Sequence, residues 1–115
     1  MRRLWLTLPM ADTEVRVYLA SPDDHDLLTE DDPTPAEGMC LRGEGVVLIS
    51  ESVPARRRLG VLVHELLHAA VFLSGAATTA RINDEREEAL VSAVAPLLTH
   101  GLVEAGMLRG KRVPA

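Results

Sequence analysis

Residues 52–75 read SVPARRRLGVLVHELLHAAVFLSG, and this stretch decides the fold. Its apolar residues recur at helical spacing, which predicts an amphipathic helix. The residues on this apolar face are Leu59, Leu62, Val63, Leu66, Leu67, Ala70 and Val71. We expect Ser52 to cap the helix, Pro54 to lie in its first turn and Gly75 to end it.

The same helix carries the pattern HExxH at residues 64–68. Residues four positions apart lie on one helical face, so His64 and His68 can reach a single metal ion. Glu65 is about 100° further round the helix, where it can take a proton from a water molecule that the metal holds. Zinc lowers the pKa of such a water to about 7. The pattern therefore predicts a zinc site with His64 and His68 as ligands and Glu65 as general base.

A catalytic zinc ion usually has three protein ligands, and the third must come from another segment. Glu87 and Glu88 open a second helical pattern downstream of the motif. Acidic residues are also common in a first helical turn because they complement the helix dipole. Helical geometry alone leaves the choice between Glu88 and Glu87 open.

The N-terminal half of the chain has the pattern of strands. Residues 4–8 form a short apolar run, and residues 15–19 alternate apolar with polar side chains. Residues 39–41 and 46–49 flank a glycine-containing turn at 43–45, which predicts a hairpin. The acidic, proline-containing segment 21–35 is expected to be a solvated loop.

The rest of the chain predicts one further helix. A polar loop over residues 76–83 precedes Asp84, which can cap a helix that runs through Leu98. Pro96 lies inside this pattern and should kink the helix or split it near Ala95. Arg56 begins a run of three arginines that we expect to be a solvated first turn.

Composition limits the function. The chain has 115 residues, of which 47% are hydrophobic and 25% charged, which indicates one globular domain over residues 1–115. Aromatic residues make up 3% and the net charge is −5, so nucleic acid is not expected as a partner. No apolar run is long enough to span a membrane or to form a secretory signal. A single cysteine, Cys40, fits a reducing compartment, and we expect a cytoplasmic protein.

Together, the strand at 46–49, the HExxH helix and the Glu88-Ala89 pair resemble a minimal gluzincin. The similarity covers roughly residues 44–98 and is greatest to small zinc metallopeptidases of the ImmA/IrrE type and those encoded by phages. The resemblance implies that His64, His68 and Glu88 bind Zn²⁺ and that Glu65 is the general base. It also implies that an extended peptide adds to the strand that precedes the helix, residues 46–50. Leu90 stands where the family usually has asparagine, so Glu87 stays open as third ligand.

Other interpretations use the same residues. Peptide deformylase also has HExxH with an upstream cysteine ligand, and Cys40 invites that comparison, although Met39 interrupts the signature. Tyr18 and His100 are the available side chains for stabilising an oxyanion, and each also fits a structural role. His25 lies among acidic residues where a second metal site is conceivable, although a solvated turn is favoured.

We therefore expect a small α+β domain of zincin type, with a short twisted sheet packed on the HExxH helix and a following helix. The expected reaction is hydrolysis of a peptide bond in a peptide or protein substrate. Glu65 would remove a proton from water and pass it to the leaving amine. The alternative is a zinc-binding module with little or no catalysis that acts by docking to a regulatory protein.

Overall fold

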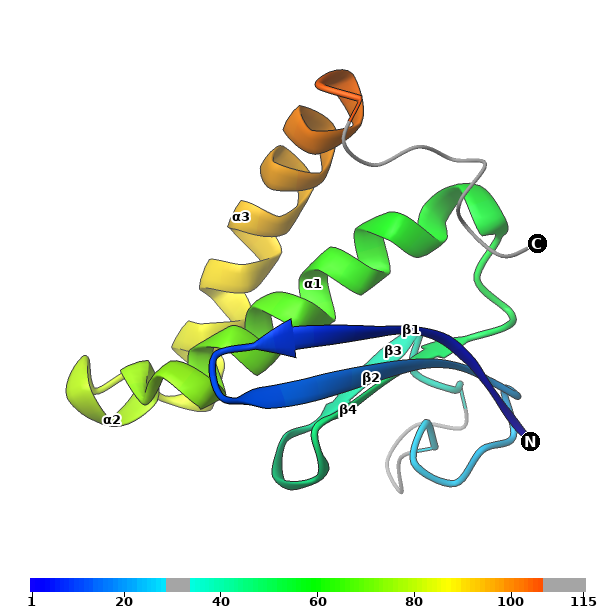
Figure 1. Cartoon of the computed structure of the whole chain (residues 1–115), viewed down its shortest axis with the longest axis horizontal. Helices are drawn as coiled ribbons and strands as arrows, with labels where there is room; N and C mark the ends of the chain where they lie inside the picture. Colours follow the sequence, from blue (N-terminus) through cyan, green and yellow to red (C-terminus); the bar gives the residue numbers. More distant parts are fainter. Residues whose placement is uncertain (29–33, 107–115) are drawn as a thin grey trace.

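The computed structural model describes residues 1–28 and 34–106, which form an α+β domain (Figure 1). Its strands are β1 (Arg2–Met10), β2 (Thr13–Ala20), β3 (Gly38–Leu41) and β4 (Val46–Ser50). Its helices are α1 (Ala55–Ser74), α2 (Ala76–Thr79) and α3 (Asp84–Glu104), and a 3₁₀ turn spans Arg42–Glu44. The predicted strands and the two long helices are confirmed. The predicted loop segment 21–35 lies partly outside the described residues.

The four strands form one mixed sheet in the order β1-β2-β4-β3. β1 and β2 are antiparallel, β2 and β4 are parallel, and β3 and β4 are antiparallel. All five residues of β4 are buried, and the strand is paired on both sides. The expectation that residues 46–50 form a free edge for a peptide is therefore wrong. β3 holds that edge because the hairpin folds it onto the outer side of β4.

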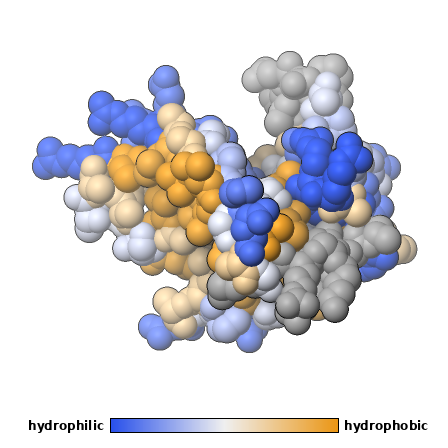
Figure 2. Space-filling view, turned by 90° about the horizontal axis from the view of Figure 1, so that it is seen from above, coloured by the Kyte–Doolittle hydropathy of each residue, from blue (hydrophilic) through white to orange (hydrophobic). Residues whose placement is uncertain are grey.

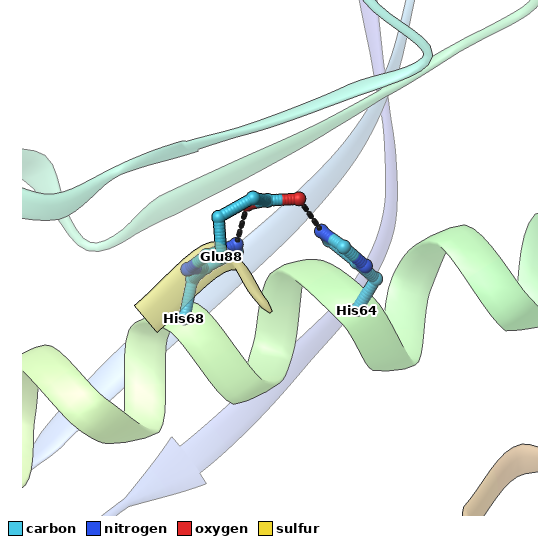
Figure 3. A group of neighbouring side chains, drawn as sticks. All are labelled: His64, His68 and Glu88. Atoms are coloured by element: carbon cyan, nitrogen blue, oxygen red, sulfur yellow. Dashed lines mark hydrogen bonds and ion pairs between the residues drawn. The ribbon is translucent and has the colours of Figure 1, made fainter. Parts of the chain in front are cut away.

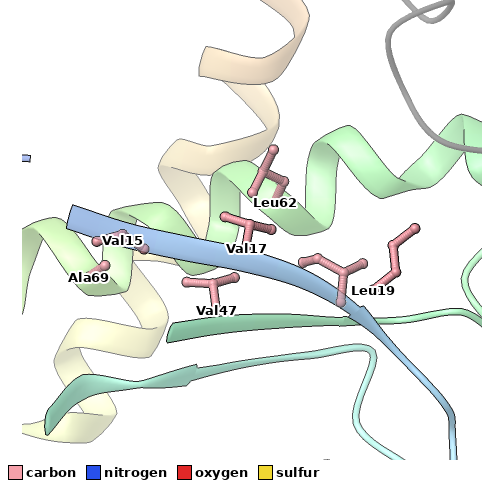
Figure 4. Packing of buried hydrophobic residues seen from close by; sticks show 7 residues of the cluster. Val15, Val17, Leu19, Val47, Leu62 and Ala69 are labelled. Carbon is pink, nitrogen blue, oxygen red and sulfur yellow. The ribbon is translucent and has the colours of Figure 1, made fainter. Parts of the chain in front are cut away.

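Side chains alternate between the two faces of the sheet, and each face has its own apolar cluster. The cluster between the sheet and α1 consists of Val15, Val17, Leu19, Val47 and Ile49 of the strands and Leu62 and Ala69 of the helix (Figure 4). The second cluster contains Ala20, Leu27, Val46 and Leu48, with Tyr18 packed against it. α1 thus lies directly on the sheet, and α3 packs on α1 rather than on the strands.

The ends of α1 differ in part from expectation. Gly75 ends the helix in a left-handed conformation (φ 73°), as predicted. Pro54 occupies the N-cap position instead of the first turn, and no side chain caps the helix. The Ser52 hydroxyl lies 2.7 Å from that of Ser50, so the predicted Ser52 cap is wrong. Ser52 instead closes the turn that follows β4.

The arginine run at the start of α1 is only partly solvated. Arg58 is 6% exposed and donates through Nε to the carbonyl of Val53 at 2.9 Å. Arg57 pairs with Glu37 at 2.7 Å, and only Arg56 of the run fits the expected solvated face fully. The prediction fails at Arg58 because its guanidinium satisfies carbonyls of the turn that leads into the helix.

The connection between the long helices also differs from the predicted loop. Residues 76–79 form the short helix α2. The cap of α3 is Asn83, whose side chain accepts a hydrogen bond from the backbone of Arg86 at 2.8 Å, so the predicted Asp84 cap is wrong by one residue. α3 continues through Pro96 and is not split there.

α3 presents an apolar stripe beside the face that it buries on α1. Leu90, Val94, Leu97 and Leu98 are between 39% and 77% exposed. The face seen in Figure 2, which looks down on the side where α3 lies, has a broad hydrophobic area next to strongly hydrophilic groups. Within residues 1–28 and 34–106, no helix has the length and apolar character that crossing a membrane requires.

Candidate metal centre

Helix α1 brings the two histidines of the motif together. His64 and His68 stand one turn apart, with ring centroids separated by 5.0 Å. The His68 ring is 9% exposed and the His64 ring 26%. Both Nε2 atoms are directed to the same carboxylate, that of Glu88 (Figure 3).

Glu88 reaches the histidines from α3. Its Oε1 lies 3.0 Å from Nε2 of His64, and its Oε2 lies 2.7 Å from Nε2 of His68. Val91 and Ala95 are buried one and two turns further along α3, the helix that packs on α1. One atom from each of the three side chains falls within 4.8 Å of the others. Two imidazoles and a carboxylate that share one point are a donor set typical of catalytic zinc.

The His68 ring faces more hydrogen-bond acceptors than a neutral imidazole can serve. His68 faces a carboxylate at each ring nitrogen, Glu87 at Nδ1 and Glu88 at Nε2. A neutral imidazole carries only one N–H, so it cannot donate to both carboxylates. The guanidinium of Arg42 pairs with Glu87, and its charge also acts on Glu65. A divalent cation at Nε2, or a second proton on the ring, would resolve the donor conflict, and the two imidazoles with the carboxylate are a donor set that fits a metal ion.

Glu65 lies beside this group and not within it. Glu65 is buried, with 7% of its surface exposed. Burial raises the pKa of its carboxyl group more than the neighbouring histidines lower it. Burial also raises the pKa of Glu88, but His64 and the hydrogen bonds from His68 and Ser92 lower it more, so that its net pKa lies below the usual range. The two carboxyl groups thus differ in acidity. The lowered pKa of Glu88 suits a charged ligand, and the raised pKa of Glu65 suits a group that accepts a proton.

Glu87 and Glu88 face different ring nitrogens of the histidines. Glu87 is 2% exposed, and its Oε2 lies 2.5 Å from Nδ1 of His68, on the far side of the ring from Glu88. The same oxygen lies 2.6 Å from Nη2 of Arg42. Only Glu88 therefore meets the two Nε2 atoms, and Glu87, the other residue considered for the third ligand, does not.

Comparison of the chain with models of known families, with curated proteins and with solved structures found no match in any of the three. The interpretation of this centre therefore depends on its own geometry and chemistry.

The other side chains considered for the site do not join it. Cys40 lines the pocket beside the histidines, but its sulfur is not among the ligand atoms that lie within 4.8 Å of one another there. Tyr18 packs on the sheet face away from α1. His100 lies about 18 Å along the axis of α3 from Glu88. Tyr18 is therefore not placed where it could stabilise an oxyanion at the centre, whereas His100 lines the same groove as His64 and Glu88.

A groove leads from the centre along α1 and α3. Its cavity is about 700 Å³ in volume and is lined by residues such as Val61, His64 and Glu65 of α1 and Ala95 and Thr99 of α3. At the centre it adjoins a smaller pocket of about 300 Å³, which is lined by Gly38 and Cys40 of the edge strand together with the histidines. The centre is thus open to the surface between the edge strand and the helices.

Sequence reasoning missed two residues that shape the centre. Gly38 lets β3 approach α1: a Cβ there would lie 2.8 Å from Cγ1 of Val61 and 3.0 Å from Cγ of Glu65. Arg42, directly after β3, reaches Glu87 across the fold. Neither residue has a local signal of its role, because each acts on a segment distant in the sequence.

Proposed function

We propose that this protein is a zinc-dependent peptidase of the minimal gluzincin type. The observation that carries the proposal is the convergence of His64, His68 and Glu88 on one point, with Glu65 buried beside it. In this proposal the three converging side chains hold Zn²⁺, and Glu65 is the general base. A zincin-like domain is the corresponding fold assignment.

Bound zinc supplies a Lewis acid that polarises a peptide carbonyl and makes water acidic enough to lose a proton near neutral pH. Glu65 supplies the base: it accepts that proton and then donates it to the leaving amine. The raised pKa of Glu65 suits both transfers, since a carboxyl with a pKa closer to the working pH both accepts and returns a proton readily.

We propose β3 as the strand to which a substrate peptide adds. Among the described residues, β3 pairs only with β4, so its second edge keeps unpaired main-chain groups. Gly38 and Met39 of this strand line the pocket that also contains His64 and Glu65. Strand addition uses main-chain hydrogen bonds and asks little of the side chains, which fits a small domain with a short edge.

A second function is favoured by one specific observation. Tyr18 packs on the sheet face away from α1, and His100 lies about 18 Å along the axis of α3 from Glu88, so neither lies beside the two histidines. A zinc-binding module that docks to a regulatory protein, with weak or no catalysis, is consistent with that arrangement.

The substitution Glu65→Gln tests the proposal. The purified wild-type protein should bind one zinc ion and hydrolyse an unfolded substrate such as casein. The Glu65→Gln variant should keep its zinc and lose at least about 100-fold in hydrolysis, the size of a general-base contribution. Glu85→Gln, an exposed glutamate of α3, serves as the matched control and should change neither property. Hydrolysis at the wild-type rate by Glu65→Gln would contradict the mechanism, and wild-type zinc binding without hydrolysis would favour the docking module.

A further inference from the structure

Glu87 is a fully buried acid whose position needs an explanation beyond helix stability. It is 2% exposed, and an ionised carboxylate in such a place is strongly destabilising unless it is paired. Both of its partners meet the same atom: Oε2 lies 2.6 Å from Nη2 of Arg42 and 2.5 Å from Nδ1 of His68. The neighbouring acids Asp84 and Glu85 share the first turn of α3 and are exposed. The helix dipole therefore does not explain why Glu87 in particular is buried.

We infer that Arg42 and Glu87 form a positioning chain that holds His68 in the tautomer and ring orientation needed for metal binding. This inference rests on the proposed metal centre and assigns Glu87 a role outside the ligand set. In this arrangement Glu87 accepts the N–H at Nδ1 of His68, so that Nε2, which lies 2.7 Å from Glu88, can offer its lone pair to a metal ion. A carboxylate behind a ligating histidine fixes its tautomer and increases its basicity as a ligand.

Arg42 completes the chain from the strand side. Its Nη2 bonds Glu87, and its Nη1 lies 3.6 Å from Oδ1 of Asp84. The guanidinium and the Nδ1 atom of His68 thus meet the same carboxylate oxygen of Glu87 from two different elements. The chain joins the turn after β3, the middle of α1 and the start of α3, which are the three elements around the centre.

The two histidines differ in this support. In the part of the chain that the structure describes, His64 has a carboxylate partner at Nε2 only, whereas His68 has one at each nitrogen. The 9% exposure of the His68 ring against 26% for His64 agrees with this difference. We therefore expect His68 to be the histidine whose orientation the protein fixes in advance.

Metal affinity tests the inference directly. Zinc dissociation constants should be measured by competition with a chromogenic chelator for wild type, Glu87→Gln and the matched control Glu85→Gln. Glu87→Gln should bind one zinc ion about 10 to 100 times more weakly, the range for loss of an outer-sphere partner, and Glu85→Gln should match wild type. The Co²⁺-substituted Glu87→Gln variant should keep a tetrahedral absorption spectrum with shifted bands, because its ligands are unchanged and the His68 ring is less constrained.

Each outcome bears on the inference. Wild-type zinc affinity in Glu87→Gln would overturn it while leaving the proposed centre intact. Loss of the tetrahedral cobalt spectrum, equal to that caused by Glu88→Gln, would make Glu87 a ligand and would also overturn it. A wild-type protein that binds no zinc would overturn the inference together with the proposed function. If Glu87→Gln fails to fold, the zinc affinity of Arg42→Met is the deciding measurement. A several-fold weaker affinity would support the positioning chain, and an unchanged affinity would refute it.

Discussion

Two clusters in this protein contain the residue types that bind metals, and they differ in what surrounds them. His64, His68 and Glu88 form one, and Asp24, His25 and Asp26 form the other. In the second cluster Arg2 already supplies the positive charge, with Nε 2.8 Å from Asp24 and Nη2 2.5 Å from Asp26. His25 has a side chain that is 87% exposed and lies 3.4 Å from Asp26.

The difference is one of scaffold and of charge balance. The first cluster comes from two long helices in contact, with an additional carboxylate, Glu87, behind one of its histidines. The second comes from one loop of consecutive residues, where a resident guanidinium balances the acids. The expectation of a solvated turn holds for His25 but not for Asp24, whose side chain is 8% exposed and bonded to Arg2. The first cluster thus has the rigid scaffold that a metal site needs, whereas in the second Arg2 already pairs with the acids.

The largest expected difference between the clusters is in zinc binding. His64→Ala should lower zinc affinity by more than the roughly 100-fold that marks the upper range for an outer partner, because it removes a ligand. His25→Ala, the matched change in the loop cluster, should leave the affinity and the stoichiometry unchanged. Zinc content after dialysis and chelator competition measure both. Equal zinc content and affinity in wild type and His64→Ala would contradict the expected difference between the two clusters.

A smaller effect is expected from packing behind the cluster of His64, His68 and Glu88. Gly38→Ala introduces a methyl group 2.8 Å from Val61 and 3.0 Å from Glu65, which is too close without movement of strand or helix. We expect a loss of about 1–3 kcal/mol in the free energy of unfolding, as for other overpacked sites. Gly43→Ala has no atom within 4 Å of the new methyl group and is the control. Urea denaturation of the two variants measures the difference; equal stability would show that β3 is not held tightly against α1.

The smallest expected effect lies in the loop cluster and depends on pH. The hydrogen bond from Arg2 lowers the pKa of Asp24 from 3.8 to about 2. This stabilisation is complete above the unfolded pKa and is lost as the pH falls from about 4 through about 2. Asp24→Asn should therefore cost about 1 kcal/mol at pH 7, after allowance for the partly exposed Arg2, and the difference from wild type should shrink towards pH 2.

Urea denaturation at pH 7 and near pH 2.5 measures the pH effect, with the exposed Asp12→Asn as control. A difference between Asp24→Asn and wild type that stays constant over this range would show that the ion pair with Arg2 does not contribute in the way described.

Much of the fold could be predicted because its signals are local. The apolar spacing of residues 59–71 and Gly75 gave α1 and its end, and alternation gave β2. The errors concern details that depend on neighbours in space. Asn83 instead of Asp84 caps α3, and Ser52 bonds Ser50 instead of the helix start. Of the kink or split predicted at Pro96, the split is absent, since a long helix that packs on α1 can continue past one missing hydrogen bond.

The sequence by itself determined the pairing of His64 with His68 and the place of Glu65 next to them, because positions one helical turn apart share a face whatever the rest of the chain does. It also offered Glu87 and Glu88 as the two candidates for the carboxylate that meets the histidines. Only the tertiary structure decided between them, because the angle at which α3 crosses α1 sets which carboxylate meets Nε2 and which meets Nδ1. It likewise placed the free edge on β3, since strand order is a property of long-range pairing that no local pattern records.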